Sequence, residues 1–154
     1  MPLDPQIEVI IALVKKANAP EYWQLTPDQA REQYELRVAK LTLKEDIFRS
    51  EERRIPGPVG DIPVRLYTPR APRSGEKFPV LVWYHGGGFV IGSLDTHDSA
   101  CRLLANRTEC IVVSVEYRLA PEHKFPAAVD DSLAALTWVA RHADEFGGDP
   151  HCLA

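Results

Sequence analysis

Three glycines follow a histidine in the stretch His85-Gly86-Gly87-Gly88, directly after an apolar run over residues 80–84. One glycine is enough to end a strand. Three in a row remove the side chains from a whole loop, so that another group can approach the backbone amides closely. Amides directed at one point stabilise the negative charge that develops on a carbonyl oxygen during acyl transfer. The stretch therefore predicts an oxyanion-binding loop, and a flexible glycine turn is the alternative.

A second unusual segment runs from Tyr117 to Ala128 and follows another apolar run at residues 111–115. The histidine-glycine tetrad is typical of the oxyanion loop of lipases and esterases. With these two segments, the chain resembles the amino-terminal half of the bacterial hormone-sensitive-lipase-like carboxylesterases, a branch of the α/β-hydrolase superfamily. The resemblance begins at the amino-terminal helices and continues through residues 95–98 to residues 148–150. It implies an open, mostly parallel α/β sheet with an amino-terminal helical cap.

The resemblance also implies a serine nucleophile in a glycine-flanked elbow, directly after the strand that residues 152–154 begin. No serine of this sequence has glycine at both the second position before it and the second position after it. The triad of this fold follows the order serine, acid, histidine. We therefore expect no catalytic residue within the chain, with nucleophile, acid and base all beyond Ala154.

The resemblance places the oxyanion donors at the backbone amides of Gly87 and Gly88, within the tetrad that includes Gly86. A third donor would come from the residue after the serine. His85 lies too early in the chain to be the triad base. We expect it to support the loop through hydrogen bonds.

Other side chains are candidates for the substrate pocket or for bracing. Phe89 either lines the acyl pocket or packs in the core. Tyr22 and Trp23, between the first two helices, either form pocket walls or pack within the cap itself. Arg118 and Glu122 are candidates for buried ion pairs that brace the loop, a role that shifts a pKa without implying catalysis.

A metal site is a weaker interpretation of the segment Asp95-Thr96-His97-Asp98, because the further ligands that zinc sites use are absent from it. Loop bracing, with Asp98 capping the following helix, is the expectation. Three cysteines without Cys-x-x-Cys spacing, Cys101, Cys110 and Cys152, predict reduced and mostly buried thiols. We expect neither a metal nor an organic cofactor.

Composition excludes other classes of function. The 154 residues are 45% hydrophobic and 26% charged, which is ordinary for a globular protein. A net charge of −4 with scattered lysines and arginines predicts no nucleic-acid partner. The apolar stretch at residues 7–14 is too short to span a bilayer, so no membrane partner and a cytoplasmic location are expected.

Hydrophobic periodicity predicts the elements that position the glycine motif. Two amphipathic helices come first, and the second begins with Thr26 as N-cap and Gln29 as its capping-box partner. Residues 1–44 are thus expected to form the cap, and residues 45–154 the first half of the hydrolase domain. Helices are predicted over 5–18, 26–40, 99–107 and 126–146, and strands over 45–55, 62–67, 80–84 and 111–115.

Two functions are compatible with these residues. The first is a serine carboxylesterase acting on short to medium acyl esters through an acyl-enzyme. This chain would then supply the oxyanion hole and cap, and would be inactive without the remaining half of the domain, covalently joined or present as a second fragment. The second is a non-catalytic fragment or ligand-binding module on the same fold.

Overall fold

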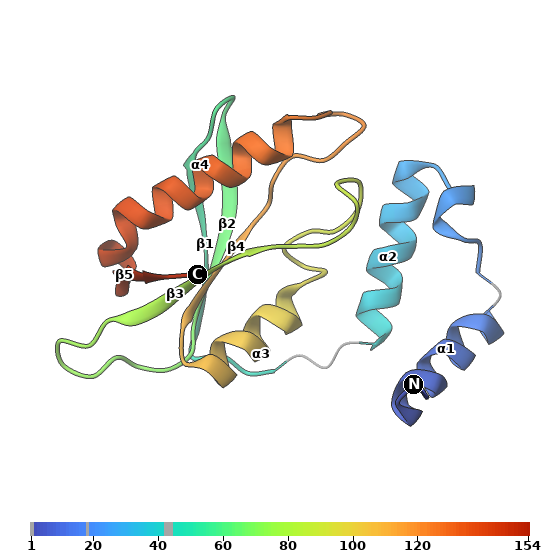
Figure 1. The fold of residues 1–154 in the computed structure, drawn as a ribbon, viewed down its shortest axis with the longest axis horizontal. Coiled ribbons are helices and arrows are strands. Elements are labelled where there is room, and N and C mark those ends of the chain that lie inside the picture. The colour runs from blue at the N-terminus through green and yellow to red at the C-terminus, as the bar shows by residue number, and fades with distance from the viewer. Residues whose placement is uncertain (1, 18, 42–44) are drawn as a thin grey trace.

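A mixed five-stranded sheet organises the molecule in the computed structural model, which describes residues 2–17, 19–41 and 45–154 (Figure 1). The strands lie in the order β1-β2-β4-β3-β5. Strands β3, β4 and β5 are parallel, whereas β2 is antiparallel to both β1 and β4. The strands are β1 Arg49–Pro56, β2 Asp61–Thr68, β3 Phe78–Tyr84, β4 Ile111–Val115 and β5 Gly148–Leu153.

Helix α3 (Asp98–Thr108) covers one face of this sheet and α4 (Ala127–His142) covers the other (Figure 1). Every residue of β4 is buried. Val113 and Val115 pack in the core beneath α4, while Val112 packs with Cys101 of α3. The missing alternation of polar and apolar residues in β4 thus follows from burial on both faces.

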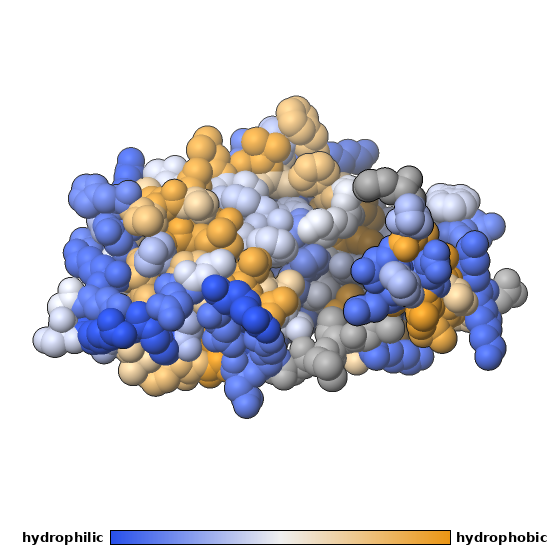
Figure 2. Space-filling model, turned by 60° about the horizontal axis from the view of Figure 1, so that its bottom comes forward, coloured by the Kyte–Doolittle hydropathy of each residue, from blue (hydrophilic) through white to orange (hydrophobic). Residues whose placement is uncertain are grey.

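The amino-terminal helices α1 (Pro5–Ala17) and α2 (Pro27–Leu41), with the short 3-10 helix η1 (Tyr22–Gln24) between them, lie beside this body (Figure 1). Helix α1 buries none of its residues. Its apolar side chains contribute to the orange surface over this part of the molecule (Figure 2). The predicted boundary between cap and hydrolase domain, at residue 44, lies outside the described residues.

Local signals placed several elements accurately. The capping box at α2 is present, because Thr26 N–H donates to Gln29 Oε1 at 3.0 Å and Gln29 N–H donates to Thr26 Oγ1 at 3.4 Å. Three predicted elements differ most in extent, among them β5, which begins at Gly148 where residue 152 was expected. Strand β1 begins at Arg49, later than predicted, and α4 ends at His142, where a 3-10 turn η2 (Ala143–Phe146) continues to β5.

The predicted cap of α3 is wrong. Asp98 is the first residue of the helix, and His97 occupies the N-cap position without a side-chain cap bond. The carboxylate of Asp98 instead accepts hydrogen bonds from the side chains of Arg65, Tyr67 and Arg102. Two arginines and a phenol thus bind this carboxylate. These charge-assisted hydrogen bonds are stronger than hydrogen bonds between neutral groups.

Among the described residues, no helix combines the length and the apolar character that crossing a bilayer requires.

Candidate active site

Two loops meet where the neighbouring parallel strands β3 and β4 end. The glycine loop, residues 85–92, follows β3, and the Tyr117 loop, residues 116–126, follows β4. Tyr84 and Val115 are register partners at the ends of these strands, so both loops leave the same edge of the sheet. Open α/β sheets bind their ligands at this edge.

The backbone of the glycine loop has a conformation at position 87 that only glycine can adopt. Its φ is +136°, and a Cβ there would lie 1.9 Å from the carbonyl oxygen of Ile91. The Gly87 carbonyl closes the loop by accepting the N–H groups of Val90 and Ile91, each at 3.1 Å. Gly88 has a φ of +61°, but a Cβ on it would meet no atom within 4 Å. A side chain is therefore excluded at Gly87 by a steric clash. At Gly88 a side chain is disfavoured only by the backbone conformation.

The amides of Gly87 and Gly88 remain available to a bound group. Neither N–H donates a hydrogen bond to any residue in the part of the chain that the structure describes. Most backbone N–H groups in proteins donate a hydrogen bond. Adjacent N–H groups that have no acceptor within the protein are typical of an anion-binding site. The glycine loop can therefore hold a negatively charged oxygen.

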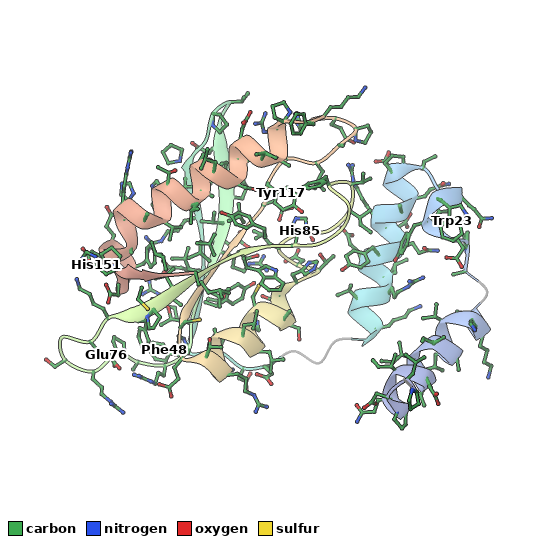
Figure 3. The ribbon with its side chains drawn as sticks, in the orientation of Figure 1. Trp23, Phe48, Glu76, His85, Tyr117 and His151 are labelled. Atoms are coloured by element: carbon green, nitrogen blue, oxygen red, sulfur yellow. The ribbon has the colours of Figure 1, made fainter. Side chains whose placement is uncertain are left out.

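His85 is held inside the loop by its neighbours. Its side chain is 3% exposed, its ring stacks on Tyr117 with 4.3 Å between ring centroids, and its Nδ1 lies 2.9 Å from the Gly86 carbonyl oxygen. Tyr117 Oη donates to the His85 carbonyl at 2.5 Å, and both side chains lie where the strands end (Figure 3). Burial lowers the pKa of His85, which favours the neutral ring. These contacts suit a supporting residue.

Sequence reasoning overlooked Gly92, which makes room for that histidine. Its φ is +102°, and a Cβ on it would lie 2.3 Å from His85 Nδ1. The signal in the sequence was a fourth glycine four residues after Gly88. Only the close contact in the folded loop shows why a side chain is excluded there.

Arg118 and Glu122 each form an ion pair, with partners that the sequence did not indicate. Arg118 binds Asp131 of α4 through its Nε at 2.8 Å and its Nη2 at 2.7 Å, and its backbone N–H donates to the same carboxylate at 3.0 Å. Glu122 binds Arg31 of α2 through both oxygens, at 2.9 and 2.7 Å. Both residues lie in an irregular loop, where position along the chain does not indicate which charged side chain lies nearby.

Asp131 and Glu116 are supporting residues that sequence reasoning missed. Asp131 is 2% exposed; burial raises its pKa, but the hydrogen bonds from Arg118 outweigh burial and leave the pKa below its ordinary value. Glu116 accepts the Leu94 N–H at 2.6 Å, and burial raises its pKa. In the sequence, Asp131 is an acid early in a predicted helix, a position that by itself indicates only a favourable interaction with the helix dipole. No pattern in the sequence indicated its partner.

An apolar cavity of about 250 Å³ lies beside the glycine loop. Phe89 lines it, is 59% exposed, and packs edge-on against Tyr117 with 6.3 Å between centroids. Phe89 therefore lies at the cavity surface and outside the core. The lining residues are Gly88, Phe89, Ala120, His123, Phe125, Pro126, Ala128 and Val129.

Tyr22 and Trp23 lie away from that cavity. Trp23 is 81% exposed and lies on the far side of α2 from His85 (Figure 3). Tyr22 packs edge-on against Tyr34 of α2 at 6.4 Å, and the guanidinium of Arg37 lies 5.1 Å from its ring centroid. Tyr22 thus packs within the amino-terminal helices, the second of the two roles considered for it.

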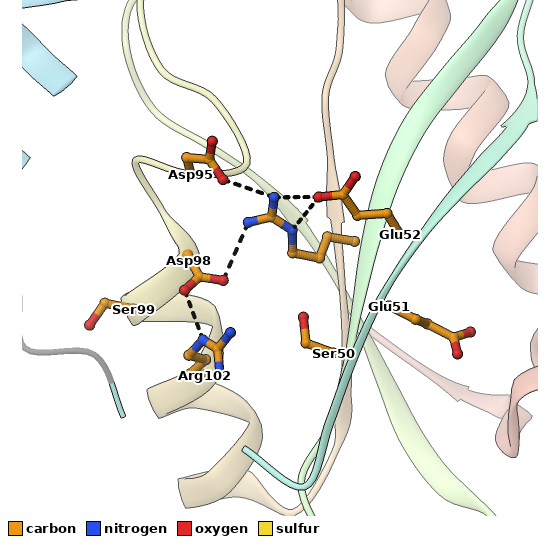
Figure 4. Close-up of a pocket in the computed structure, with 8 residues that line it drawn as sticks. Ser50, Glu51, Glu52, Asp95, Asp98, Ser99 and Arg102 are labelled. Carbon is orange, nitrogen blue, oxygen red and sulfur yellow. Dashed lines mark hydrogen bonds and ion pairs between the residues drawn. The ribbon is translucent and has the colours of Figure 1, made fainter. Parts of the chain in front are cut away.

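A second hollow, of about 600 Å³, lies between β1, β2 and α3 and contains the Arg65 cluster of Arg65, Glu52, Asp95, Asp98 and Arg102 (Figure 4). Arg65 binds three carboxylates, those of Glu52 at 2.6 Å, Asp95 at 2.8 Å and Asp98 at 3.3 Å. Its guanidinium donors are used within the protein. Among the described residues, no group of three or more histidine, cysteine or acidic side chains has an arrangement that could hold a metal ion.

Two thiols, Cys101 and Cys110, are buried, and Cys152 is exposed. All three are free.

Comparison with known proteins places this geometry in context. Residues 81–154 match the family model described as "alpha/beta hydrolase fold". Carboxylesterase NlhH of Mycobacterium tuberculosis is 56% identical over 94 residues, 61% of this chain and 29% of that protein. An arylesterase of Saccharolobus solfataricus is 34% identical across 100% of this chain and 49% of its own length.

A solved structure agrees with both sequence matches. The hyperthermophilic esterase of Pyrobaculum calidifontis superimposes with a TM-score of 0.88 at 44% identity, covering 100% of this chain and 49% of that one. This chain therefore spans about half the length, or less, of the relatives that it matches.

Proposed function

The chain belongs to the α/β-hydrolase family, in its hormone-sensitive-lipase-like branch, and from that premise we propose that it is the oxyanion-hole half of a serine carboxylesterase. The observation that carries this proposal is the pair of unpaired amides at Gly87 and Gly88, beside an apolar cavity. The esterase names of the relatives support the same reaction class.

In the proposed reaction, a serine beyond Ala154 attacks the ester carbonyl while a general base takes the hydroxyl proton. The carbonyl π electrons move to the oxygen, which the amides of Gly87 and Gly88 bind in the tetrahedral intermediate. Collapse expels the alcohol, which takes up the proton, and leaves an acyl-enzyme that water hydrolyses. One such amide donor is typically worth roughly 10²–10³ in rate. Gly86 directly precedes these donors in the loop.

Substrate preference follows from the cavity beside the donors. Its volume of about 250 Å³ and its largely apolar lining suit a short to medium acyl group, with Phe89 as one wall. Residues 1–44 act in this proposal as a cap beside the loop. The partner required for activity is the remaining half of the hydrolase domain, whether covalent or a second fragment.

The intact mass of the purified protein before and after incubation with a fluorophosphonate tests the proposal, because this reagent adds mass only to an activated serine. We expect a polypeptide longer than the 17.3 kDa chain, or a second fragment, to gain one phosphonyl group. The recombinant chain of 154 residues should gain none. A single unmodified species of 17.3 kDa in the purified protein would contradict the esterase and favour a binding module.

A further inference from the structure

Arg31 of α2 makes a set of contacts that connects the amino-terminal helices to the candidate active site. Its Nε donates to the Val90 carbonyl at 2.9 Å, and its Nη2 donates to the Ala120 carbonyl at 3.0 Å. Its two terminal nitrogens also bind both carboxylate oxygens of Glu122, at 2.9 and 2.7 Å. One side chain thus reaches both loops at the end of the sheet.

The carbonyl groups that Arg31 binds belong to the backbone that shapes the glycine loop. Val90 carries one of the N–H groups that close the loop on the Gly87 carbonyl, at 3.1 Å. Ala120 donates its own N–H to the Phe89 carbonyl at 2.8 Å, which joins the Tyr117 loop to the glycine loop directly. Arg31 therefore binds one carbonyl in the glycine loop and one in the Tyr117 loop, at the point where the two loops are joined. This point follows directly after the two free amides in the glycine loop.

These contacts require a guanidinium. Its planar fork presents donors in fixed directions, so it can bind a carboxylate with two nitrogens and still reach two carbonyls. A lysine ammonium would keep the charge opposite Glu122 but could not span the same acceptors. The Glu122 carboxylate stays ionised because the hydrogen bonds from Arg31 lower its pKa to about 2. The Glu122 carboxylate thus stays charged opposite the fork at neutral pH.

Stacked and tilted rings provide a second contact between α2 and the glycine loop. The ring centroids of Tyr34 on α2 and His97 lie 6.2 Å apart. His97 in turn stacks on His85 at 5.4 Å. Helix α2 is thus connected to the loop at its first residue through rings and at Val90 through Arg31.

We propose that Arg31 is a positioning residue that couples the docking of α2 to the direction of the Gly87 and Gly88 amides. Resting on the proposed esterase function, this assigns to the amino-terminal helices a role in transition-state stabilisation besides covering the site. Only when Arg31 holds Val90 and Ala120 do the two amides converge on one oxygen. The loop loses that alignment when the fork is replaced.

Three variants separate the fork from the charge. Arg31→Lys keeps the charge and removes the bonds to the two carbonyls. Glu122→Gln removes the charge of the nearer carboxylate and leaves those bonds, together with the contact to Asp28 Oδ1 at 3.4 Å. Arg37→Lys is the matched control, because Arg37 lies on the same helix and contacts the Tyr22 ring. Amide hydrogen exchange in the purified protein should be roughly threefold to tenfold faster at Val90 and Ile91 in Arg31→Lys, the effect of losing about one net hydrogen bond. Glu122→Gln should show a smaller change and Arg37→Lys none.

Kinetics with a short acyl ester provide the second measurement. A misaligned donor pair costs rate, so kcat of Arg31→Lys should fall roughly tenfold to a hundredfold while KM stays within about twofold. A merely structural role would lower the melting temperature and leave kcat unchanged well below it. Unchanged exchange and unchanged kcat in Arg31→Lys would overturn the positioning role in a reactive protein.

The two proposals fail in different ways. A wild-type protein that does not react with fluorophosphonate overturns the esterase, and with it the catalytic role of Arg31, whatever the exchange data show. A reactive wild-type protein whose Arg31→Lys variant keeps the wild-type kcat while Glu122→Gln loses it would show that the charge at position 31 suffices. That result would overturn the specific requirement for the guanidinium fork.

Discussion

The glycine loop and the Arg65 cluster both present several hydrogen-bonding groups, yet those groups are in opposite states. Arg65 binds three carboxylates, one of which also binds Arg102, so the charges compensate one another. The glycine loop carries almost no charge, but the amides of Gly87 and Gly88 have no acceptor among the described residues. A dense group of charged side chains is thus less informative about chemistry than two unpaired backbone donors.

This difference predicts that changes in the glycine loop remove chemistry and changes in the Arg65 cluster remove stability. Gly87→Ala should have the largest effect. Its Cβ would lie 1.9 Å from the Ile91 carbonyl oxygen, so the loop must open and the donors must move. We expect the rate of phosphonylation of the assembled enzyme to fall at least about a hundredfold.

Gly60→Ala is the matched control for Gly87→Ala, because a Cβ at Gly60 meets no atom within 4 Å. It should react at the wild-type rate. Gly88→Ala should fall between the two, since its φ of +61° is strained for alanine but its side chain meets nothing. A Gly87→Ala variant that reacts as fast as Gly60→Ala would show that the loop does not supply the donors.

Asp131→Ala tests whether a compensated pair between the Tyr117 loop and α4 behaves like the Arg65 cluster. Asp131 is 2% exposed and binds both the side chain and the backbone of Arg118. Removing it should lower the free energy of unfolding by about 3 kcal/mol, measured by urea denaturation. The adjacent and exposed Asp130, replaced in the same way, should change it by less than about 0.5 kcal/mol. Equal losses in the two variants would contradict burial as the cause.

The same carboxylate predicts a dependence on pH. Because the net pKa of Asp131 is lowered in the folded protein, its contribution is fully present above the unfolded pKa of about 3.9. It is lost as the pH falls through the lower, folded pKa. Denaturation curves of wild type and Asp131→Ala should therefore differ most above about pH 4 and converge in stronger acid. Curves that stay parallel throughout would contradict an ionised Asp131.

Arg65→Gln should cost stability and leave the chemistry intact. The side chain of Arg65 is 14% exposed, and without its charge the carboxylates of Glu52, Asp95 and Asp98 repel one another. We expect the free energy of unfolding to fall by about 2 kcal/mol, with the phosphonylation rate of the folded protein unchanged. Glu52→Gln, at a side chain that is 67% exposed, should change stability by less than about 1 kcal/mol. A loss of reactivity in folded Arg65→Gln would place the cluster in the catalytic site.

Tyr117→Phe should have a smaller effect than Gly87→Ala, Asp131→Ala or Arg65→Gln. Phenylalanine keeps the ring that stacks on His85 but loses the hydroxyl that donates to the His85 carbonyl at 2.5 Å. The free energy of unfolding should fall by about 1 kcal/mol, measured by urea denaturation. A loss of reactivity greater than that of Gly88→Ala would assign Tyr117 a more direct role than support of the loop.

Short-range patterns in the sequence were sufficient for much of the architecture. The apolar runs at 80–84 and 111–115 lie in β3 and β4, and the capping box at Thr26 marks the start of α2. Each signal depends on residues adjacent in the chain, where backbone geometry and burial impose a period. The three glycines of residues 86–88 belong to the same class, because a loop without side chains is a local property.

The partners of the charged side chains were decided only by the tertiary structure. Arg118 pairs with Asp131 and Arg31 with Glu122, and Asp98 binds Arg65 where a helix cap was expected. Gly92 needs its missing side chain only because His85 folds against it. A long side chain binds the acceptor that the packed elements bring within about 3 Å of it. The number of residues between two side chains does not give the distance between them in the folded protein. The sequence therefore determined the strands, the helices and the glycine loop, while packing determined what holds the loop in place.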